Sequence, residues 1–218
     1  GEAGLGKSSL VRRIAEDANR HGDWTTPQIR IALGTDPMKR VATEVLRLAD
    51  RAGLPARGEK RIGDVLARVQ SVALSGVSVA LRRGSQPEPH VALTELLVEI
   101  GRAAIAHGNV VVIHIDEIQN LTDERALSQL LIALGDAITY TVTVTVPGGT
   151  LLERSLPIAV YLTGLPEFEQ ASGSRTGATF SRRFLTTILA PLEDDDLRSA
   201  LRSMVLTGRE VTDDAGGI

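Results

Sequence analysis

The chain begins with Gly1-Glu2-Ala3-Gly4-Leu5-Gly6-Lys7-Ser8, which fits the pattern G-x-x-x-x-G-K-[ST] at every fixed position. Glycines permit backbone angles that turn successive N–H groups inward, where they can bind phosphate oxygens. Lys7 supplies a cation for the β- and γ-phosphates, and the Ser8 hydroxyl is a hard oxygen ligand for Mg²⁺. The stretch therefore predicts a nucleotide phosphate loop that extends to Ser9.

A helix is required after such a loop, because its positive N-terminal end faces the phosphates. The next residues fit this requirement: Leu10, Val11, Ile14 and Ala18 lie on one helical face and charged residues lie on the other. A hydrophobic strand is also expected before the loop, but the motif already starts at residue 1. We therefore expect that the chain lacks its natural N-terminus and the first, central strand of its sheet.

Hydrophobic patterning along the rest of the chain predicts strands that alternate with helices. The predicted strands cover residues 28–33, 109–115, 139–146, 156–162 and, as a last short one, 186–189. The predicted helices cover residues 37–52, 91–107, 126–138 and 195–206, with a short helix near 62–69 and a strand or hairpin over 71–81. This alternation is typical of an α/β fold with a mostly parallel sheet.

A second motif follows the most hydrophobic strand, Val-Val-Val-Ile-His-Ile, which ends in Asp116-Glu117. Carboxylates at the C-terminal end of a parallel strand lie where open α/β sheets bind their ligands. Asp116 can hold the Mg²⁺ that Ser8 also approaches, and Glu117 can act as a general base on a water. A strand ending in Asp-Glu is common by itself, so this interpretation depends on the phosphate loop upstream.

Composition narrows the functional classes. The chain has no cysteine, which excludes a disulfide scaffold, a thiolate metal site and a cysteine nucleophile. Twenty-four basic and 27 acidic residues in 218 give a net charge of −3, so no overall basic field indicates nucleic-acid binding. No apolar stretch approaches the roughly 20 residues that span a bilayer, and no secretory signal is apparent. These features predict a cytoplasmic protein with no membrane contact.

Residues 1–206 resemble the AAA+ class of P-loop ATPases, and most of all its origin-recognition-like and signal-transducing branches. The resemblance rests on the phosphate loop, on the strand Val110–Glu117 with Gln119 after it, and on Tyr161-Leu162-Thr163-Gly164-Leu165-Pro166. It implies a three-layer core over residues 1–192 and the start of a helical lid with a tail over 193–218. Thr163 matches the position called sensor 1, where a polar residue ends a strand and helps orient the attacking water.

The resemblance also implies roles for residues near the end of the chain. The segment Phe180–Phe184 is similar to the region in which many AAA+ proteins carry an arginine finger, so Arg182 and Arg183 are candidates. Surface cations on a helix would explain these two arginines equally well. Arg198 could act as a second sensor arginine, although a solvated arginine is the simpler interpretation.

The leading hypothesis is an Mg²⁺-dependent ATPase, acting on acid anhydrides, that drives a conformational change in a larger protein or assembly. Lys7, Glu117 and Thr163 would be its catalytic residues, and self-association or a partner protein would be expected. Three alternatives stay open: a nucleotide-controlled signalling or DNA-associated switch with little turnover, in which other domains contact DNA; a truncated, inactive copy; and a small-molecule kinase. No guanine-reading Asn-Lys-x-Asp segment occurs, which favours ATP over GTP.

Several other polar residues have structural explanations. His114 alternates with apolar strand residues, which predicts a buried imidazole held by a hydrogen bond rather than a metal ligand. Gln119 could read the γ-phosphate environment or simply begin a helix. Trp24 could cover an adenine, but closing the end of the first helix is the better interpretation. The basic residues of two loops are typical of solvated loops, namely Arg57, Lys60, Arg61, Arg82 and Arg83.

Overall fold

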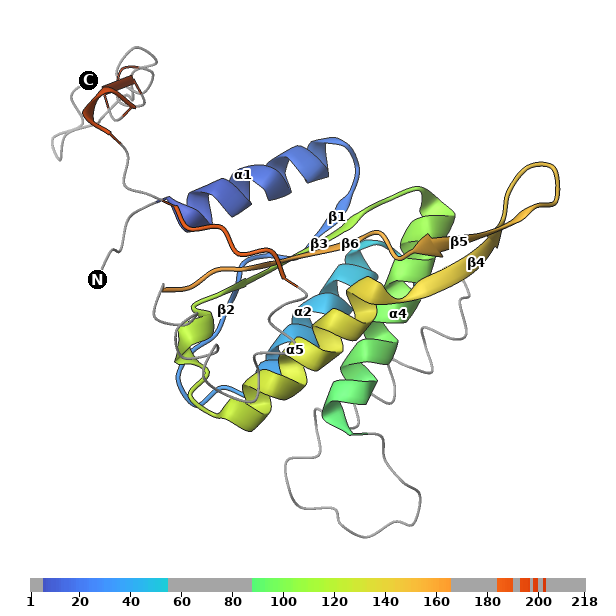
Figure 1. The fold of residues 1–218 in the computed structure, drawn as a ribbon, viewed down its shortest axis with the longest axis horizontal. Coiled ribbons are helices and arrows are strands. Elements are labelled where there is room, and N and C mark those ends of the chain that lie inside the picture. Colours follow the sequence, from blue (N-terminus) through green and yellow to red (C-terminus); the bar gives the residue numbers. More distant parts are fainter. Residues whose placement is uncertain are drawn as a thin grey trace, which may run out of the picture. The chain divides into compact units, whose positions relative to one another are not determined.

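The structure is a computed structural model, and it describes residues 6–54, 88–165, 184–189, 193–196, 198–199 and 202. The chain divides into two compact units. One is Gly6–Thr186, and the other combines Gly1–Leu5 with Thr187–Ile218. The sheet and the helices that cover it belong to the first unit (Figure 1).

The first unit contains four α-helices, one 3₁₀ helix and six strands within its described residues. In chain order they are α1 (Lys7–Arg20), β1 (Trp24–Thr25), β2 (Ile29–Arg30), α2 (Pro37–Arg51), α4 (Pro89–His107), β3 (Val111–Asp116), η2 (Ile118–Asn120), α5 (Glu124–Thr139), β4 (Thr141–Thr145), β5 (Leu151–Ser155) and β6 (Ile158–Leu162). The predicted strands at 28–33, 109–115, 139–146 and 156–162 and the predicted helices at 37–52, 91–107 and 126–138 are found, with ends shifted by a few residues. The predicted short helix near 62–69 and the strand or hairpin over 71–81 lie outside the described residues.

Strand β3 is the centre of a parallel sheet. It pairs with β6 along one edge, from Val111 opposite Ile158 to Ile115 opposite Leu162. The short strands β1 and β2 pair with β3 along its other edge, at its beginning and its end. Thr26 lies between them and continues the contact, because its N–H donates to the carbonyl of Val112 at 2.9 Å. The α/β class and the parallel sheet are thus confirmed.

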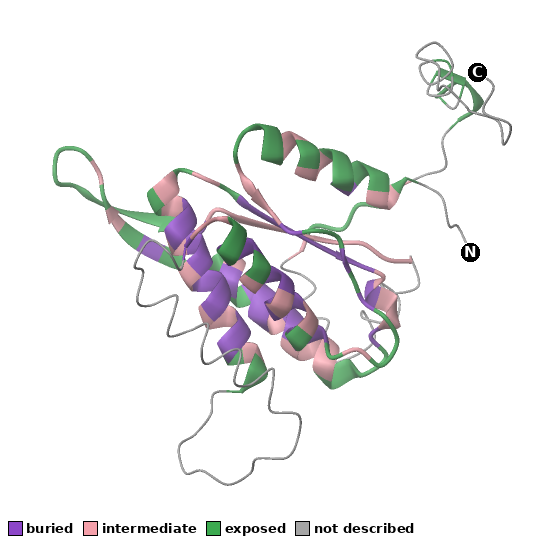
Figure 2. Ribbon diagram, turned by 180° about the vertical axis from the view of Figure 1, so that it is seen from behind, coloured by how far each residue is buried: buried purple, intermediate pink, exposed green. Residues whose placement is uncertain are grey.

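The two faces of this sheet are covered unequally. Helices α2, α4 and α5 lie on one face, and α1 lies on the other (Figure 1). The three-helix face holds the main core, to which β3 contributes Val111, Ile113 and Ile115. In Figure 2 all of β3 is buried, whereas α1 is exposed or half-buried except at Val11. Leu10, predicted on the inward face of that helix, is 50% exposed.

Local sequence explains where the core helices begin. Asp36 precedes α2 and accepts a hydrogen bond from the N–H of Lys39 at 3.1 Å, and Pro37 occupies the first turn. Asp123 does the same for α5, accepting from the N–H groups of Arg125 and Ala126. An aspartate at this position satisfies backbone donors that the helix itself cannot pair. The predicted helix starts shift by only two residues at α4 and α5.

Gly101 allows α4 to approach the start of β6 closely. A Cβ atom at this position would lie 3.0 Å from Ile158 Cδ1 and from both Cβ and Cδ1 of Leu156. Gly101→Ala should gain about 0.5–1 kcal/mol of helix propensity and lose about 1–3 kcal/mol to crowding, so we expect net destabilisation of about 1 kcal/mol. Chemical denaturation measures it, with Ala106→Ser on the exposed side of α4 as control. An equal or higher unfolding free energy would contradict this packing.

A β-hairpin separates α5 from β6. Strands β4 and β5 pair antiparallel, with Val142 opposite Arg154 and Val144 opposite Leu152. The base of the hairpin packs through Val142 on a small cluster with Val98 and Leu156. The predicted strand at 139–146 corresponds to β4. The sequence does not predict β5, because all five of its residues are exposed and its pattern, Leu-Leu-Glu-Arg-Ser, does not alternate.

The last predicted strand, at residues 186–189, is wrong: residues 184–189 form neither helix nor strand. Leu185 and Ile188 are 95% and 72% exposed, so the apolar residues that suggested a strand are not buried in a sheet.

In the second unit, residues 194–196, 198, 199 and 202 are helical, in agreement with the predicted helix from 195. Arg198 lies there with a 79% exposed side chain, 3.8 Å from Asp195.

Within the described residues, none of the helices combines the length and the apolar character needed to cross a bilayer.

Candidate functional site

Alternation along β3 divides its side chains between the two faces of the sheet. Val111, Ile113 and Ile115 point into the helix-covered core, so His114 and Asp116 point to the face that carries α1. Both are buried, with exposures of 4% and 5%. A buried carboxylate needs hydrogen-bond donors to offset the loss of water. Its donors come from three separate parts of the chain.

Asp116 accepts hydrogen bonds on both carboxylate oxygens. The Thr163 hydroxyl donates to Oδ1, and the Gln28 side-chain amide donates to Oδ2. The Ser8 hydroxyl also donates to Oδ2, at 3.4 Å. Burial alone raises the pKa of Asp116, but the hydrogen bonds from Thr163, Gln28 and the Glu117 N–H, together with His114, outweigh it and lower the pKa. The carboxylate is therefore ionised at neutral pH.

Ser8 reaches this carboxylate because it lies in the first turn of α1. Gly6 precedes that helix in the left-handed conformation, with φ 79°, which glycine adopts without strain. It has no side chain to cap the helix, and no acidic residue lies in the first turn. The carboxylate that lies near this N-terminal turn, and so near the positive end of the helix dipole, therefore comes from another element, Asp116 of β3. Of the predicted phosphate loop, Gly1–Leu5 lie outside the described residues.

The donor set suits magnesium better than a metal that needs a full protein cage. Among the described residues, no group of three or more His, Asp or Glu side chains gathers as a metal site. Ser8 and Asp116 instead offer one hydroxyl and one carboxylate oxygen 3.4 Å apart. Mg²⁺ prefers one or two such protein oxygens and completes its octahedron with waters and substrate phosphates. The residues present therefore fit Mg²⁺ bound together with a nucleotide.

Glu117 has an unusual backbone. It is the one non-glycine residue with positive φ (60°) in the described part of the chain. Such a conformation costs of order 1–3 kcal/mol and persists where its surroundings fix it, often at functional sites. Here the fixing contacts are the Gln119 amide, which donates to Glu117 Oε2, and the N–H of Ile118, which donates to the Thr163 carbonyl at 3.2 Å. Contacts from η2 and from the loop after β6 thus surround this left-handed residue.

Gln119 connects Glu117 to the loop after β6. Its amide nitrogen binds Glu117, and its Oε1 accepts from the N–H of Leu165 at 3.3 Å. Asn120, in the same 3₁₀ helix η2, donates to the carbonyl of Ile31 at 2.8 Å and so connects the end of β2. These contacts give Gln119 a further role, in which it holds Glu117 and the loop after β6 together.

Gly164 permits the loop after β6 to approach η2 closely. A Cβ atom there would lie 2.7 Å from Ile118 Cγ2 and 2.8 Å from Gln119 Oε1. Gln119 can turn away, but Ile118 is 2% exposed and belongs to the core. Gly164→Ala should therefore separate the two loops, break the Leu165–Gln119 bond and lower the unfolding free energy by about 1–3 kcal/mol. Denaturation measures this, and an unchanged stability would show that the loops have room to move.

His114 is buried and hydrogen-bonded, as the sequence predicts. Its Nε2 lies 2.9 Å from the Thr163 hydroxyl oxygen, and its backbone N–H donates to the Thr26 hydroxyl at 3.2 Å. Burial lowers the pKa of His114, and the nearby charge of Asp116 opposes this only in part. The imidazole is therefore neutral at pH 7.

The lowered pKa of His114 predicts a pH effect on stability. The unfolded chain titrates this group near the ordinary value of 6.5, and the folded chain titrates it at lower pH. Between the two values the unfolded state binds more protons, so stability falls as pH drops below about 6.5. His114→Phe removes this contribution and should lose less stability between pH 7 and pH 5 than the wild type. Denaturation at several pH values without nucleotide or Mg²⁺ tests this, with His21→Gln as the matched single-histidine variant.

Gln28 and Thr26 were missed by sequence reasoning. They lie between β1 and β2, where the pairing with β3 is interrupted. The sequence does indicate that Gln28 lies on the polar face of this segment. Ile29 and Ile31 belong to the core, so Gln28 and Arg30, which alternate with them, point to the opposite face. Nothing in the sequence indicates that this edge lies beside Asp116.

Other candidate residues have ordinary surroundings or are not described. Trp24 packs on the core, and its ring lies 5.5 Å from that of His107. Arg182 and Arg183, the arginine-finger candidates, lie outside the described residues. So do the basic loop residues Arg57, Lys60, Arg61, Arg82 and Arg83.

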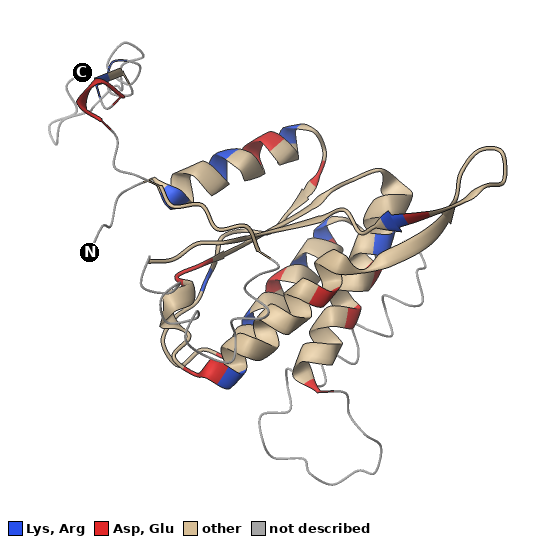
Figure 3. Ribbon diagram, in the orientation of Figure 1, with Lys and Arg blue, Asp and Glu red and all other residues tan. Residues whose placement is uncertain are grey.

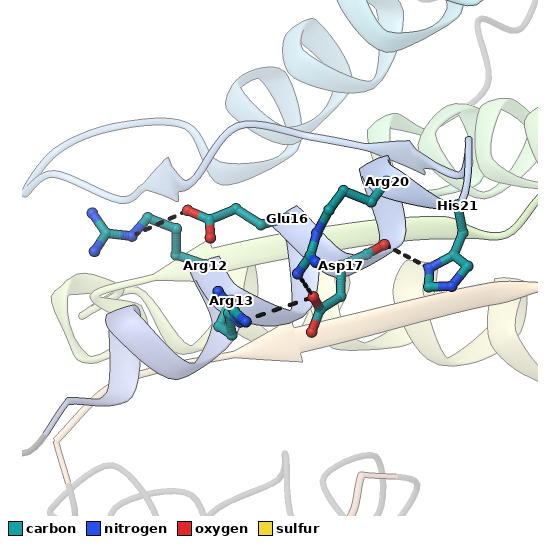
Figure 4. A network of polar contacts seen from close by, with 6 residues as sticks. All are labelled: Arg12, Arg13, Glu16, Asp17, Arg20 and His21. Carbon is teal, nitrogen blue, oxygen red and sulfur yellow. Dashed lines mark hydrogen bonds and ion pairs between the residues drawn. The ribbon is translucent and has the colours of Figure 1, made fainter. Parts of the chain in front are cut away.

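The outer surface of α1 carries charges of both signs (Figure 3). Arg12 forms an ion pair with Glu16 at 3.8 Å, and Asp17 forms ion pairs with Arg13 and Arg20 (Figure 4). The His21 ring contacts the carbonyl of Asp17. These side chains are about half exposed or more, so each pair contributes little stability. The network marks the solvent-exposed side of α1.

No protein family matches this chain, and no curated protein does either.

Proposed function

We propose that this chain binds Mg²⁺-ATP and hydrolyses it. The observation that carries the proposal is the convergence of Ser8, Asp116 and Thr163, which come from three distant parts of the sequence. A helix N-terminus, a hydroxyl and an ionised carboxylate at the C-terminal edge of a parallel sheet are the parts that a P-loop hydrolase requires. The motif of Gly1–Ser8 supports the same conclusion.

Each residue has a distinct role in the proposed reaction. Lys7 and the N–H groups at the start of α1 bind the β- and γ-phosphates. Ser8 and Asp116 hold Mg²⁺, which when bound neutralises charge on the phosphate oxygens. Glu117 accepts the proton of the attacking water, and its left-handed turn and the Gln119 bond hold it beyond the end of β3.

We assign Thr163 a role different from the one that the resemblance implies. Its hydroxyl hydrogen is directed at Asp116 Oδ1 rather than at open space. The resemblance to sensor 1 implies that it orients water, whereas this contact supports a role in holding the magnesium carboxylate. The general architecture around the site, a three-layer AAA+ core with a helical lid, is part of this proposal.

The direct test is nucleotide binding and phosphate release by the 218-residue chain. We expect ATP to bind in the presence of Mg²⁺, with weaker binding after chelation of the metal by EDTA, and to release inorganic phosphate over time. GTP is the matched control for base preference. Binding without phosphate release would favour the nucleotide-controlled switch, and no binding of either nucleotide would contradict the proposal.

A further inference from the structure

Three side chains form a continuous hydrogen-bonded series on the polar face of the sheet: His114, Thr163 and Asp116. His114 Nε2 lies 2.9 Å from Thr163 Oγ1, and the same hydroxyl contacts Asp116 Oδ1. His114 and Asp116 are both nearly inaccessible to water, with exposures of 4% and 5%. Water can replace the partners of these buried groups less readily than it can replace those of a hydrogen bond at the surface.

Each hydrogen bond of this series has a defined donor and a defined acceptor. An ionised carboxylate can only accept, so the hydrogen between Thr163 and Asp116 belongs to Thr163. A hydroxyl has one hydrogen, and Thr163 has already used it. The hydrogen between His114 and Thr163 must therefore be on His114 Nε2. The series runs from the imidazole N–H to the hydroxyl and from the hydroxyl to the carboxylate.

We propose that His114 is a positioning residue that, as the Nε2–H tautomer, fixes the Thr163 hydroxyl so that it donates to Asp116. The backbone supports this arrangement, because His114 is paired with Tyr161 in the register of β3 and β6 and its N–H is held by Thr26. Without the imidazole donor, the threonine side chain can rotate and Asp116 loses one of its hydrogen bonds. The consequence for turnover rests on the proposed ATPase function, but the tautomer does not.

The first test reads the tautomer and needs no nucleotide. Side-chain nitrogen NMR on ¹⁵N-histidine-labelled protein distinguishes Nε2–H from Nδ1–H imidazole, and His114→Gln assigns the signal. We expect Nε2–H, with its hydrogen-bond shift lost in Thr163→Val. The Nδ1–H tautomer would overturn the proposal whatever the enzyme activity.

The second test is a double-mutant cycle on ATP turnover. His114→Phe keeps the ring without a donor, and we expect it to lower kcat about tenfold while changing KM for ATP less than twofold. His114→Gln supplies an amide donor at similar reach and should recover most of kcat. Because His114 acts through Thr163, His114→Phe should have little further effect when Thr163→Val is already present.

The outcomes of the two tests separate the two proposals. Additive losses of kcat in the cycle, or equal losses in the Phe and Gln variants, would mean that His114 is only a packing residue and would overturn the positioning role. Absence of turnover in the wild-type chain would contradict both the ATPase proposal and the kinetic role of His114. The direction of the hydrogen-bonded series would still be decided by the tautomer.

Discussion

Glu117→Gln should abolish most ATP turnover while leaving ATP binding intact. Glutamine has the shape of glutamate but cannot take a proton from water, so loss of the general base should lower kcat by about 10²–10⁴-fold. The local structure should survive, because the glutamine side-chain oxygen can still accept the bond that Gln119 donates. Phosphate release measures kcat, and equilibrium binding of ATP with Mg²⁺ measures the affinity.

The matched control is Glu16→Gln on the exposed face of α1. It makes the same chemical change in the helix that follows the phosphate loop, but removes only a surface pair with Arg12. We expect wild-type turnover from this control. Unchanged turnover in Glu117→Gln would show that Glu117 is not the base, and equal losses of binding and turnover would show that the substitution disturbs the nucleotide site as a whole.

The parts of the fold predicted well from sequence are those in which one pattern dominates. The core helices have strong apolar periodicity, α2 and α5 begin after Asp36 and Asp123, and α4 begins at Pro89. Their predicted boundaries are close to the observed ones. Strand β3 reads as a continuous β-branched run because both of its faces are covered and its six residues are all buried. Here local sequence and tertiary environment favour the same structure.

The errors occur where the sequence lacks information about neighbours. All residues of strand β5 are exposed, so its sequence does not need to alternate between apolar and polar residues. The strand forms because it pairs with β4. Residues 186–189 have strand-like composition, but Ile188 is 72% exposed and no strand forms. Composition predicts which residues can enter a sheet, whereas sheet formation also requires an edge to pair with.

The candidate site shows the same division. The motifs indicate Ser8, Asp116 and Glu117 by type and spacing, and the fold brings Ser8 to Asp116 across a sequence separation of 108 residues. The motifs do not indicate Gln28, because it approaches Asp116 only through the interrupted pairing of β1 and β2 with β3. The resemblance assigns Thr163 to water, whereas in the structure its hydroxyl donates to Asp116 and contacts His114. The sequence predicts His114 as a buried, hydrogen-bonded residue but does not indicate its partner.

Asp116→Asn should weaken the response to Mg²⁺ more than any other single change in the site. Asparagine keeps the size of the side chain and one acceptor for Thr163, and Gln28 can turn its amide to present oxygen instead of nitrogen. What cannot be recovered is the negative charge, since Mg²⁺ prefers a carboxylate ligand. We expect the Mg²⁺ concentration for half-maximal turnover to rise at least tenfold and kcat at saturating Mg²⁺ to fall about 10²-fold or more.

Asp123→Asn provides the matched control for this charge change. Asp123 caps α5 through the N–H groups of Arg125 and Ala126, and asparagine caps helices about as well as aspartate. Its Mg²⁺ dependence should therefore equal that of the wild type. Denaturation of both variants separates metal binding from folding: if Asp116→Asn unfolds easily but retains the wild-type Mg²⁺ dependence when folded, Asp116 is a structural carboxylate that organises Thr163 and Gln28, and Mg²⁺ must be held elsewhere.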